Sequence, residues 1–297
     1  MTLKEAIRKA RTLSCWRAPD YAVPLEGGIT NHNIRVGDGG RHFVVRLGDD
    51  IPEHQVLRWN ELAISRAAHA AGVAPGVVYN EPGVLVLDYV EAGPLAEADL
   101  HDADTLLQTV DLVARLHRDG PNHLRGPVLT FWVFHILRDY AGTLSDRGSG
   151  YMGQLPGLLD QAAMLERAVG PVTLVLGHND LLPANILRGG GRLWLIDFEY
   201  GGFNSPLFDL GGLASNAGLE PEAEAAMLRA YFGTDPTPAL RRSYAAMKCA
   251  SLLRETMWSM VSELTSTLAF DYADYTAMNL ERYRAAFDAF AAGEHST

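Results

Sequence analysis

The stretch GHNDLLPANILRGGGRLWLIDFEY, residues 177–200, decides the fold because it joins two apolar strands, a glycine turn and a set of polar side chains. The apolar segments Val172–Leu176 and Leu193–Ile196 have the composition of buried strands. Three consecutive glycines, residues 189–191, mark a tight turn. The sequence therefore predicts a β-turn-β element over residues 173–197, with polar side chains near one end.

The polar side chains of this element have the spacing that phosphoryl transfer requires. Asp180 can accept the proton of an attacking hydroxyl, while Asn185 and Asp197, with Glu199 as an auxiliary, offer the oxygen ligands that Mg²⁺ prefers. The alternatives are a turn cap at Asp180 and Asn185, or a metal hydrolase built on His178-x-Asp180. The remaining histidines are scattered, so we interpret His178 as a structural residue that bonds the loop backbone.

The part of the chain before this element alternates like a β sheet. After an amphipathic N-terminal helix, a Gly-Asp-Gly-Gly turn at residues 37–40 is typical of a hairpin. Helical periodicity follows over residues 53–71 and ends at Gly72. The expected strands are Ala22–Leu25, Asn33–Val36, Phe43–Leu47, Val77–Tyr79 and Val84–Asp88.

From residue 91 onward the pattern is mainly helical. Residues 142–153 are rich in Gly and Ser and predict a surface loop. We expect an N-terminal lobe over residues 1–90 and a larger lobe over residues 91–297, joined by a hinge near residues 89–94. The expected helices cover residues 103–118, 131–140, 154–168, 221–233, 239–266 and 273–291.

Composition narrows the function further. The chain has 297 residues, 47 % of them hydrophobic, and a net charge of −11, which excludes a fibrous or disordered protein and argues against nucleic-acid binding. Cys15 and Cys249 are far apart and predict two reduced thiols. The charged N-terminus does not resemble a signal peptide, and no apolar run approaches the ~18 residues of a membrane span. We expect a cytoplasmic protein that does not enter a membrane.

The segments around residues 178–187 and 196–202 resemble the catalytic loop and the metal-binding segment of the choline/ethanolamine kinase family. That family belongs to the aminoglycoside phosphotransferase-like small-molecule kinases, and Asn204 and Asp209 add to the likeness. The resemblance extends over residues 20–290. It implies an α+β, bilobal protein-kinase-like fold, with a small antiparallel β lobe that contains one long helix and a larger, mainly helical lobe. ATP and Mg²⁺ are the implied cofactors.

The N-terminal lobe would bind the nucleotide. Gly28, Thr30 and Asn31 form a small polar turn that could approach phosphate, and in the family this loop covers the nucleotide phosphates. Arg46 replaces the lysine of protein kinases and can contact phosphate in a bidentate way. A solvent-facing strand arginine is the alternative for Arg46.

Three further positions complete the expected nucleotide side. The partner of Arg46 is expected to be Glu61, which falls on the apolar face of its helix, with Glu53 as the alternative. The segment that contains Asp88 and Val90 should meet the adenine through backbone groups.

The C-terminal helices would select the acceptor. Glu255 and Trp258 fall on one helical face, and Tyr272 and Tyr275 follow at the same spacing. Aromatic rings beside carboxylates suit a quaternary ammonium ion, although aromatics at this spacing also form ordinary cores. Choline kinases have a similar aromatic pair of helices, but commonly with a second tryptophan where this chain has Glu255. That departure leaves choline as the expected acceptor and opens the pocket to primary amines.

The sequence therefore predicts an ATP- and Mg²⁺-dependent kinase of a small cationic alcohol, choline first, with Asp180 and Glu199 also near the substrate. Ethanolamine, thiamine and aminoglycoside kinases are alternatives on the same scaffold, and a catalytically silent nucleotide-binding module is an alternative of another class. We expect Asp209 to brace the catalytic loop and His117 to be a packed helix residue without a catalytic role. The oligomeric state is left open, a homodimer included.

Overall fold

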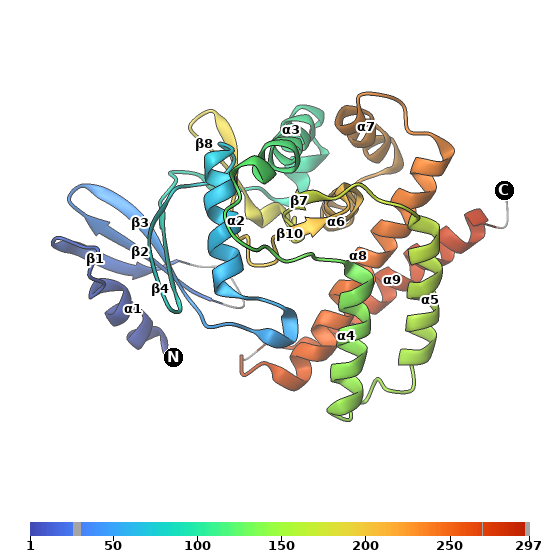
Figure 1. Ribbon diagram of the computed structural model, residues 1–297, viewed down its shortest axis with the longest axis horizontal. Helices are drawn as coiled ribbons and strands as arrows, with labels where there is room; N and C mark the ends of the chain where they lie inside the picture. The colour runs from blue at the N-terminus through green and yellow to red at the C-terminus, as the bar shows by residue number, and fades with distance from the viewer. Residues whose placement is uncertain (26–30, 269, 295–297) are drawn as a thin grey trace.

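The computed structural model describes residues 1–25, 31–268 and 270–294. Figure 1 shows a β sheet at one end of the molecule and a group of helices at the other, with helix α2 (Arg58–Ala70) between them. This is the α+β arrangement of two lobes that the sequence predicted. The last strand of the sheet ends at Asp88, and the lobe boundary at residue 90 stays a prediction.

The N-terminal sheet has, within the described residues, five antiparallel strands in the order β1-β2-β3-β5-β4. Side chains of one face, among them Ile34, Val36 and Val45, are buried in one cluster with Ala6 and Ala10 of helix α1. Alternate side chains of the strands thus pack against the apolar face of an amphipathic helix. The bounds are α1 Leu3–Arg11, β1 Pro19–Pro24, β2 His32–Asp38, β3 Arg41–Leu47, β4 Val77–Glu81 and β5 Val84–Asp88.

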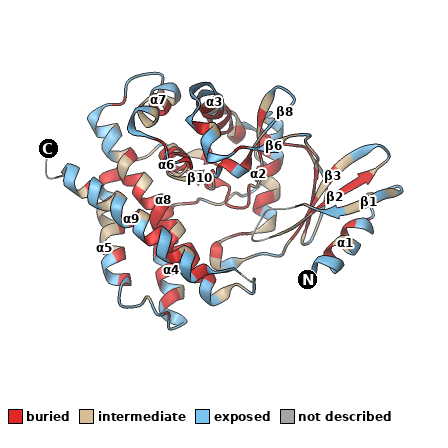
Figure 2. Cartoon of the chain, turned by 180° about the vertical axis from the view of Figure 1, so that it is seen from behind, coloured by how far each residue is buried: buried red, intermediate tan, exposed pale blue. Residues whose placement is uncertain are grey.

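Helix α8 (Pro238–Thr265) is the centre of the C-terminal lobe, because it packs against α4, α5, α6 and α9. Figure 2 shows the buried residues concentrated along its length. The other helices are α3 Ala103–Asp119, α4 Val133–Asp146, α5 Leu155–Val169, α6 Pro206–Ala217, α7 Pro221–Phe232 and α9 Tyr272–Glu294. The short strands are β6 Gly93–Pro94, β7 Val175–Gly177, β8 Ile186–Gly189, β9 Arg192–Leu195 and β10 Gly202–Asn204. Single 3₁₀ turns are η1 Pro52–His54, η2 Glu97–His101, η3 Gly120–His123 and η4 Pro183–Asn185.

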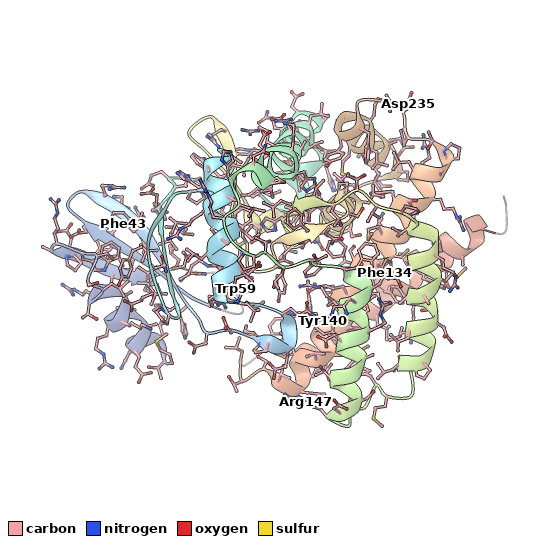
Figure 3. All side chains as sticks on the ribbon, viewed as in Figure 1. Phe43, Trp59, Phe134, Tyr140, Arg147 and Asp235 are labelled. Atoms are coloured by element: carbon pink, nitrogen blue, oxygen red, sulfur yellow. The ribbon has the colours of Figure 1, made fainter. Side chains whose placement is uncertain are left out.

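The helix predicted over residues 53–71 begins later than expected. Gln55 has a left-handed backbone with φ 57°, which ends the short η1 turn and delays the helix to Arg58. The η1 segment instead contacts the C-terminal lobe. Glu53 pairs at 2.9 Å with Arg147, which directly follows α4, and His54 lies 3.2 Å from the hydroxyl of Tyr140 on α4 (Figure 3).

The predicted β-turn-β element is also divided differently. The glycine turn joins β8 to β9 as expected, but β7 pairs with β10 rather than with β9. The loop after β7 still returns toward the end of β9, since the backbone N–H of Ile196 donates to the carbonyl of Asn185. The two polar segments therefore meet at one end of the hairpin, as the sequence indicated.

Two helical segments were missed. Helix α4 continues to Asp146, into the predicted surface loop, because Leu144 keeps the apolar periodicity and is buried. Helix α6 was not predicted, since Gly211 and Gly212 weaken its pattern. A Cβ on Gly211 would lie 2.9 Å from the Cα of Lys248, so this glycine allows α6 to pack closely on α8.

The remaining predicted helices lie within one to three residues of their expected bounds. Cys15 and Cys249 are both free thiols. Among the described residues, no helix is both long enough and apolar enough to cross a membrane.

Candidate active site

The loop between β7 and η4 is held in an unusual backbone conformation. Asn179 has φ 65°, a left-handed conformation that asparagine tolerates better than most residues. Its side-chain N–H groups donate to the carbonyls of Tyr200 and Gly202 at 3.0 and 3.2 Å. Asp197, at the end of β9, is also left-handed with φ 67°. Strained residues of this kind persist where the surrounding contacts fix them, and here both lie in the polar cluster.

Asp209, at the start of α6, anchors this loop. Its carboxylate accepts the backbone N–H groups of His178 and Asn179, each at 2.7 Å, and lies 2.8 Å from His117 Nε2. These contacts hold the pKa of Asp209 below its ordinary value against the opposing effect of burial. His117 also bonds the hydroxyl of Tyr231, so it is a buried supporting residue, and Asp209 has the bracing position that the sequence predicted.

His178 is fully buried and bonds backbone groups. Its Nε2 lies 2.8 Å from the carbonyl of Ile196, and its Nδ1 accepts the N–H of Asp180 at 3.3 Å. Burial lowers the pKa of His178, so the neutral imidazole is favoured. The structural interpretation of His178 agrees with these contacts.

Asp180 lies at the centre of the polar cluster. Asn185 donates its side-chain N–H to the Asp180 carbonyl at 2.9 Å, and Arg254 lies 3.7 Å from the Asp180 carboxylate. Burial raises the pKa of Asp180 to about 8, which Arg254 opposes and Glu255 reinforces. A buried carboxyl group of this kind is suited to hold or receive a proton.

On the other side of the cluster, Arg46 of β3 joins the two lobes. Its guanidinium pairs with Glu61 of α2 at 3.0 Å and with Asp197 at 2.5 Å. Glu199 completes the group at 3.7 Å from Arg46 and also accepts the side-chain N–H of Asn31 at 2.9 Å. The structure thus selects Glu61 as the partner of Arg46.

Arg58, at the start of α2, is a second cation in this group that the sequence analysis missed. It pairs with Glu61 at 2.7 Å and with Glu199 at 3.2 Å. Burial would raise the pKa of Asp197, but Arg46 outweighs it and the pKa lies below its ordinary value. Burial, reinforced by Asp197, raises the pKa of Glu199. The i, i+3 spacing of Arg58 and Glu61 was a readable signal for this pair.

The donor set near Asp197 fits a hard cation. Asn185, Asp197 and Glu199 offer oxygen atoms, and the Asn185 side chain keeps its carbonyl oxygen available while its N–H groups face Asp180. The described residues contain no cluster of three or more His, Cys, Asp or Glu side chains that could hold a metal without other ligands. Mg²⁺ commonly combines one or two carboxylates with water and substrate phosphates, so this donor set suits it.

Of the other residues expected to bind the nucleotide, two lie outside the described residues and two lie at the end of the sheet and in the turn after it. Gly28 and Thr30 lie outside the described residues. Asp88 ends β5, where its side chain pairs with Arg41 at 2.8 Å and its N–H donates to the carbonyl of Gly76. The Val90 carbonyl accepts the N–H of Ala92, so this segment forms the turn between the lobes.

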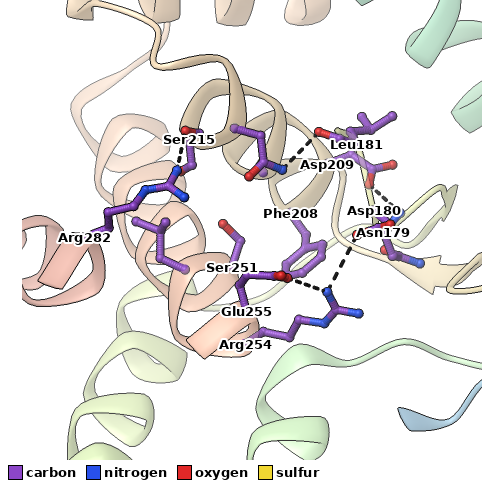
Figure 4. Close-up of a pocket in the computed structure, with 13 residues that line it drawn as sticks. Asn179, Asp180, Leu181, Phe208, Asp209, Ser215, Ser251, Arg254, Glu255 and Arg282 are labelled. Carbon is purple, nitrogen blue, oxygen red and sulfur yellow. Dashed lines mark hydrogen bonds and ion pairs between the residues drawn. The ribbon is translucent and has the colours of Figure 1, made fainter. Parts of the chain in front are cut away.

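A small pocket that opens to solvent, with a cavity of about 30 Å³, lies beside Asp180 (Figure 4). Glu255 and Arg254 line it from α8, at 3.0 Å from each other, and Arg282 lines it from α9. Ser251, Ser215 and Asn216 add polar groups. The lining residues are Asn179, Asp180, Leu181, Phe208, Asp209, Gly212, Ser215, Asn216, Ser251, Leu252, Arg254, Glu255 and Arg282.

The expected aromatic residues cluster next to this pocket rather than in its lining. Trp258 is only 7 % exposed, its indole N–H donates to the Tyr200 hydroxyl at 2.9 Å, and its ring centroid lies 5.2 Å from that of His54. Tyr272 and Tyr275 contact it edge-on. The Tyr275 hydroxyl donates to Glu255 at 2.7 Å, which links the aromatic cluster to the pocket.

Arg254 was the largest omission of the sequence analysis. It is 4 % exposed, lies 4.2 Å from the centre of the Tyr200 ring, and contacts both acidic groups of the pocket. An arginine among the buried apolar residues of a long helix was the available signal, since such residues are rarely buried without a partner.

Comparisons with known proteins agree with this geometry. Residues 22–246 match the model of the phosphotransferase enzyme family. The LicA protein of Haemophilus influenzae is 27 % identical over 279 residues, which cover 90 % of this chain and 80 % of that protein. Ethanolamine kinase 2 of mouse is 25 % identical over 87 % of this chain and 74 % of its own length. A crystal structure of a choline/ethanolamine kinase family protein from Mesorhizobium loti superposes with a TM-score of 0.78 at 27 % identity, covering 96 % of this chain and 95 % of that one. The chain belongs to the phosphotransferase enzyme family, as a small-molecule kinase of the choline/ethanolamine kinase type.

Proposed function

We propose that this kinase transfers a phosphoryl group from ATP, with Mg²⁺, to the hydroxyl of a small cationic amino alcohol. The observation that supports this most directly is the position of Asp180, which lines the pocket beside Glu255 and adjoins Asn185. A proton acceptor, an acceptor pocket and an oxygen-donor set within one cluster are the parts that phosphoryl transfer needs.

Asp180 would orient the acceptor hydroxyl and accept its proton as the new P–O bond forms. Asn185 and Asp197, with Glu199 as an auxiliary, would hold Mg²⁺, which supplies neutralisation of the negative charge on the phosphate oxygens. Arg46, positioned by Glu61, would contact nucleotide phosphate, and Gly28, Thr30 and Asn31 would cover it. Backbone groups near Asp88 and Val90 would contact the adenine.

Choline is the acceptor that the sequence favours. Its quaternary ammonium has no N–H donor, so its recognition would depend on the rings of Trp258, Tyr272 and Tyr275 together with the Glu255 carboxylate. The bond between Tyr275 and Glu255 supports this assignment, because it places an aromatic ring next to the acidic group of the pocket.

Ethanolamine is the second candidate, and a specific observation favours it. Of the described residues that line the pocket, Glu255, Ser251 and Asn216 offer hydrogen-bond acceptors, whereas Trp258 is covered by His54 on one side. A primary ammonium has N–H donors that these acceptors can satisfy.

The test is release of ADP by the purified chain with ATP, Mg²⁺ and, in separate reactions, choline, ethanolamine, thiamine and an aminoglycoside. We expect turnover with a small amino alcohol that excess EDTA abolishes. Binding of nucleotide without turnover on any alcohol, amino acids with a hydroxyl included, would instead identify a silent nucleotide-binding module.

A further inference from the structure

We propose that Arg254 of α8 contacts the phosphoryl group as it arrives on the acceptor oxygen, which makes it a further catalytic residue of this kinase. The inference rests on the proposed kinase function and adds a residue to it. Its basis is a buried guanidinium beside Asp180 whose hydrogen-bond donors are only partly used (Figure 4).

Most donors of Arg254 have no acceptor. The side chain is 4 % exposed, and a guanidinium group has five N–H donors. The Nη1 atom donates to Glu255 at 3.0 Å and lies 3.7 Å from the Asp180 carboxylate. The Nε and Nη2 atoms are buried and have no hydrogen-bond partner in the described part of the chain. Buried polar groups are nearly always bonded, so unpaired donors on a residue that lines the pocket indicate an oxygen atom of a ligand.

Aromatic rings hold the guanidinium of Arg254 in place without using these donors. Its Cζ lies 4.2 Å from the centre of the Tyr200 ring and 5.6 Å from that of the Phe131 ring. A guanidinium that stacks on a ring uses its flat face, and its N–H groups remain in the plane for other acceptors. Figure 4 shows the guanidinium extending toward Asp180. Arg254 is therefore oriented for a ligand in the pocket.

The position of Asp180 defines where the phosphoryl group would arrive. In the proposed reaction the acceptor oxygen bonds to the γ-phosphorus of ATP, the bond between that phosphorus and an oxygen of ADP breaks, and the hydroxyl proton passes to Asp180. The acceptor oxygen would lie about 2.5–3.0 Å from the Asp180 carboxylate, and the phosphorus is bonded directly to this oxygen. Because Arg254 lies 3.7 Å from the same carboxylate, its donors are within reach of the phosphoryl oxygens.

The charges change during the reaction in the direction that favours this contact. Proton transfer to Asp180 removes a negative charge beside Arg254, while the phosphoryl group brings negative charge to the same place. An arginine positioned where negative charge arrives stabilises the transition state of phosphoryl transfer. The contact also explains a cation in a pocket for a cationic alcohol, since the product has a phosphate group in addition to its ammonium.

The experiment compares binding of an acceptor with binding of its phosphate ester. The probes are choline with phosphocholine and ethanolamine with phosphoethanolamine, each titrated by calorimetry in the presence of Mg²⁺ and ADP. The measured quantity is the Kd of the ester divided by the Kd of the alcohol. Arg254→Gln should raise this ratio roughly 10–100-fold, because a charge-assisted hydrogen bond is lost. Arg254→Lys keeps the charge beside Asp180 and Glu255 but lacks the planar donor set, so it should raise the ratio about three- to tenfold.

ADP release with the alcohols provides the second measurement. Both Arg254 variants should lower kcat and leave the KM for ATP unchanged. Arg241→Gln, which replaces an exposed arginine on the same helix, is the matched control and should keep the wild-type ratio and kcat.

A wild-type ratio or a wild-type kcat in the Arg254 variants would overturn the inference and leave Arg254 as a support for Asp180 and Glu255. If Arg254→Gln does not fold, Arg254→Lys alone decides, because it retains the positive charge that its two carboxylate partners contact. Failure of the kinase function itself would be distinguishable, since the wild-type chain would then release no ADP with any of the alcohols.

Discussion

The two charged regions beside Asp180 differ in how completely their charges are paired. On the nucleotide side, Arg46, Arg58, Glu61, Asp197 and Glu199 form a closed group in which every guanidinium contacts carboxylates. On the acceptor side, Arg254 contacts two carboxylates, while Arg282 is held by neutral groups alone within the described residues.

This difference in pairing suggests different roles for the two charged regions. Buried charges that are mutually paired fix the relative position of the elements that contribute them, here β3, α2 and the segment after β9. A charge that is held in place without an opposite charge is instead available to a ligand. We therefore propose that the paired group around Arg46 holds the two lobes in position for the nucleotide, and that the pocket side selects the substrate.

The largest expected effect is on kcat, from replacement of Asp180, which lies between the two charged regions. Asp180→Asn keeps the shape of the side chain but removes its ability to accept a proton. We expect kcat on the best acceptor to fall by about 10²–10⁴-fold while nucleotide binding is retained. Steady-state ADP release and nucleotide titration measure the two quantities. A variant with near wild-type kcat would contradict the role of Asp180.

The closed group itself can be broken at Arg46. Arg46→Met leaves the buried Asp197 without its cation, and Glu61 and Glu199 with Arg58 alone, so we expect a loss of about 3–5 kcal/mol in the free energy of unfolding. Chemical denaturation measures it. The control is Arg41→Met on the same strand, whose exposed pair with Asp88 should contribute at most about 1 kcal/mol. Equal losses for the two variants would show that burial does not distinguish the two ion pairs.

The pH dependence of the free energy of unfolding tests His54, a buried residue that contacts both lobes. Burial, reinforced by Arg254, lowers the pKa of His54 to about 3, whereas the unfolded chain has an ordinary value near 6.5. As the pH falls, His54 is therefore protonated in the unfolded chain before it is protonated in the folded chain. Its contribution to the free energy of unfolding is complete above pH 6.5 and is lost as the pH falls toward 3. The expected loss from this residue is about 2 kcal/mol at pH 5.

The variant for this test is His54→Gln, which should flatten the decline in the free energy of unfolding between pH 6.5 and pH 5. His135→Gln is the control, because His135 is exposed on α4 and its removal should leave the slope unchanged. Identical slopes for the wild type and His54→Gln would mean that His54 is protonated in the folded chain.

The smallest expected effect concerns the acceptor side. Glu255→Gln removes a carboxylate that bonds Tyr275 and Arg254, and a primary ammonium depends on that carboxylate more than a quaternary one does. We expect kcat/KM for ethanolamine to fall by about three- to tenfold more than that for choline, as a hydrogen bond to a charged group is weakened. Equal losses would favour the aromatic cluster around Trp258 as the recognition element.

The clustering of residues on the nucleotide side was more predictable from the sequence than the pocket on the other side. Asp180, Asn185 and Asp197 lie within one short stretch, so their spacing indicated that they would lie close together, and their chemistry stays a prediction. Glu61 was identified from helical periodicity, because the apolar face of α2 determines which of its acidic residues points inward.

The acceptor pocket combines side chains from α6, α8 and α9, which are distant in the sequence. Arg254 and Arg282 became recognisable only when these helices were packed together, since the charge of an arginine does not indicate which pocket it enters. Helix α6, which contributes Ser215, was itself missed because its two glycines weaken the local pattern. Periodicity placed Trp258 on the same helical face as Glu255, but it does not distinguish a ring that lines a pocket from one that is covered by His54, as Trp258 is.

The contacts of the η1 segment have a consequence for how the molecule unfolds. Residues 53–55 of the N-terminal lobe bond Tyr140 and Asp139 of α4 and Arg147 directly after it, and His54 also bonds Ser262 of α8. Separation of the lobes would expose the buried polar groups of His54, Tyr140 and Ser262 together with the ring of Trp258. Calorimetry should therefore record one cooperative transition for the whole chain, with equal calorimetric and van't Hoff enthalpies, rather than separate melting of the sheet and the helices.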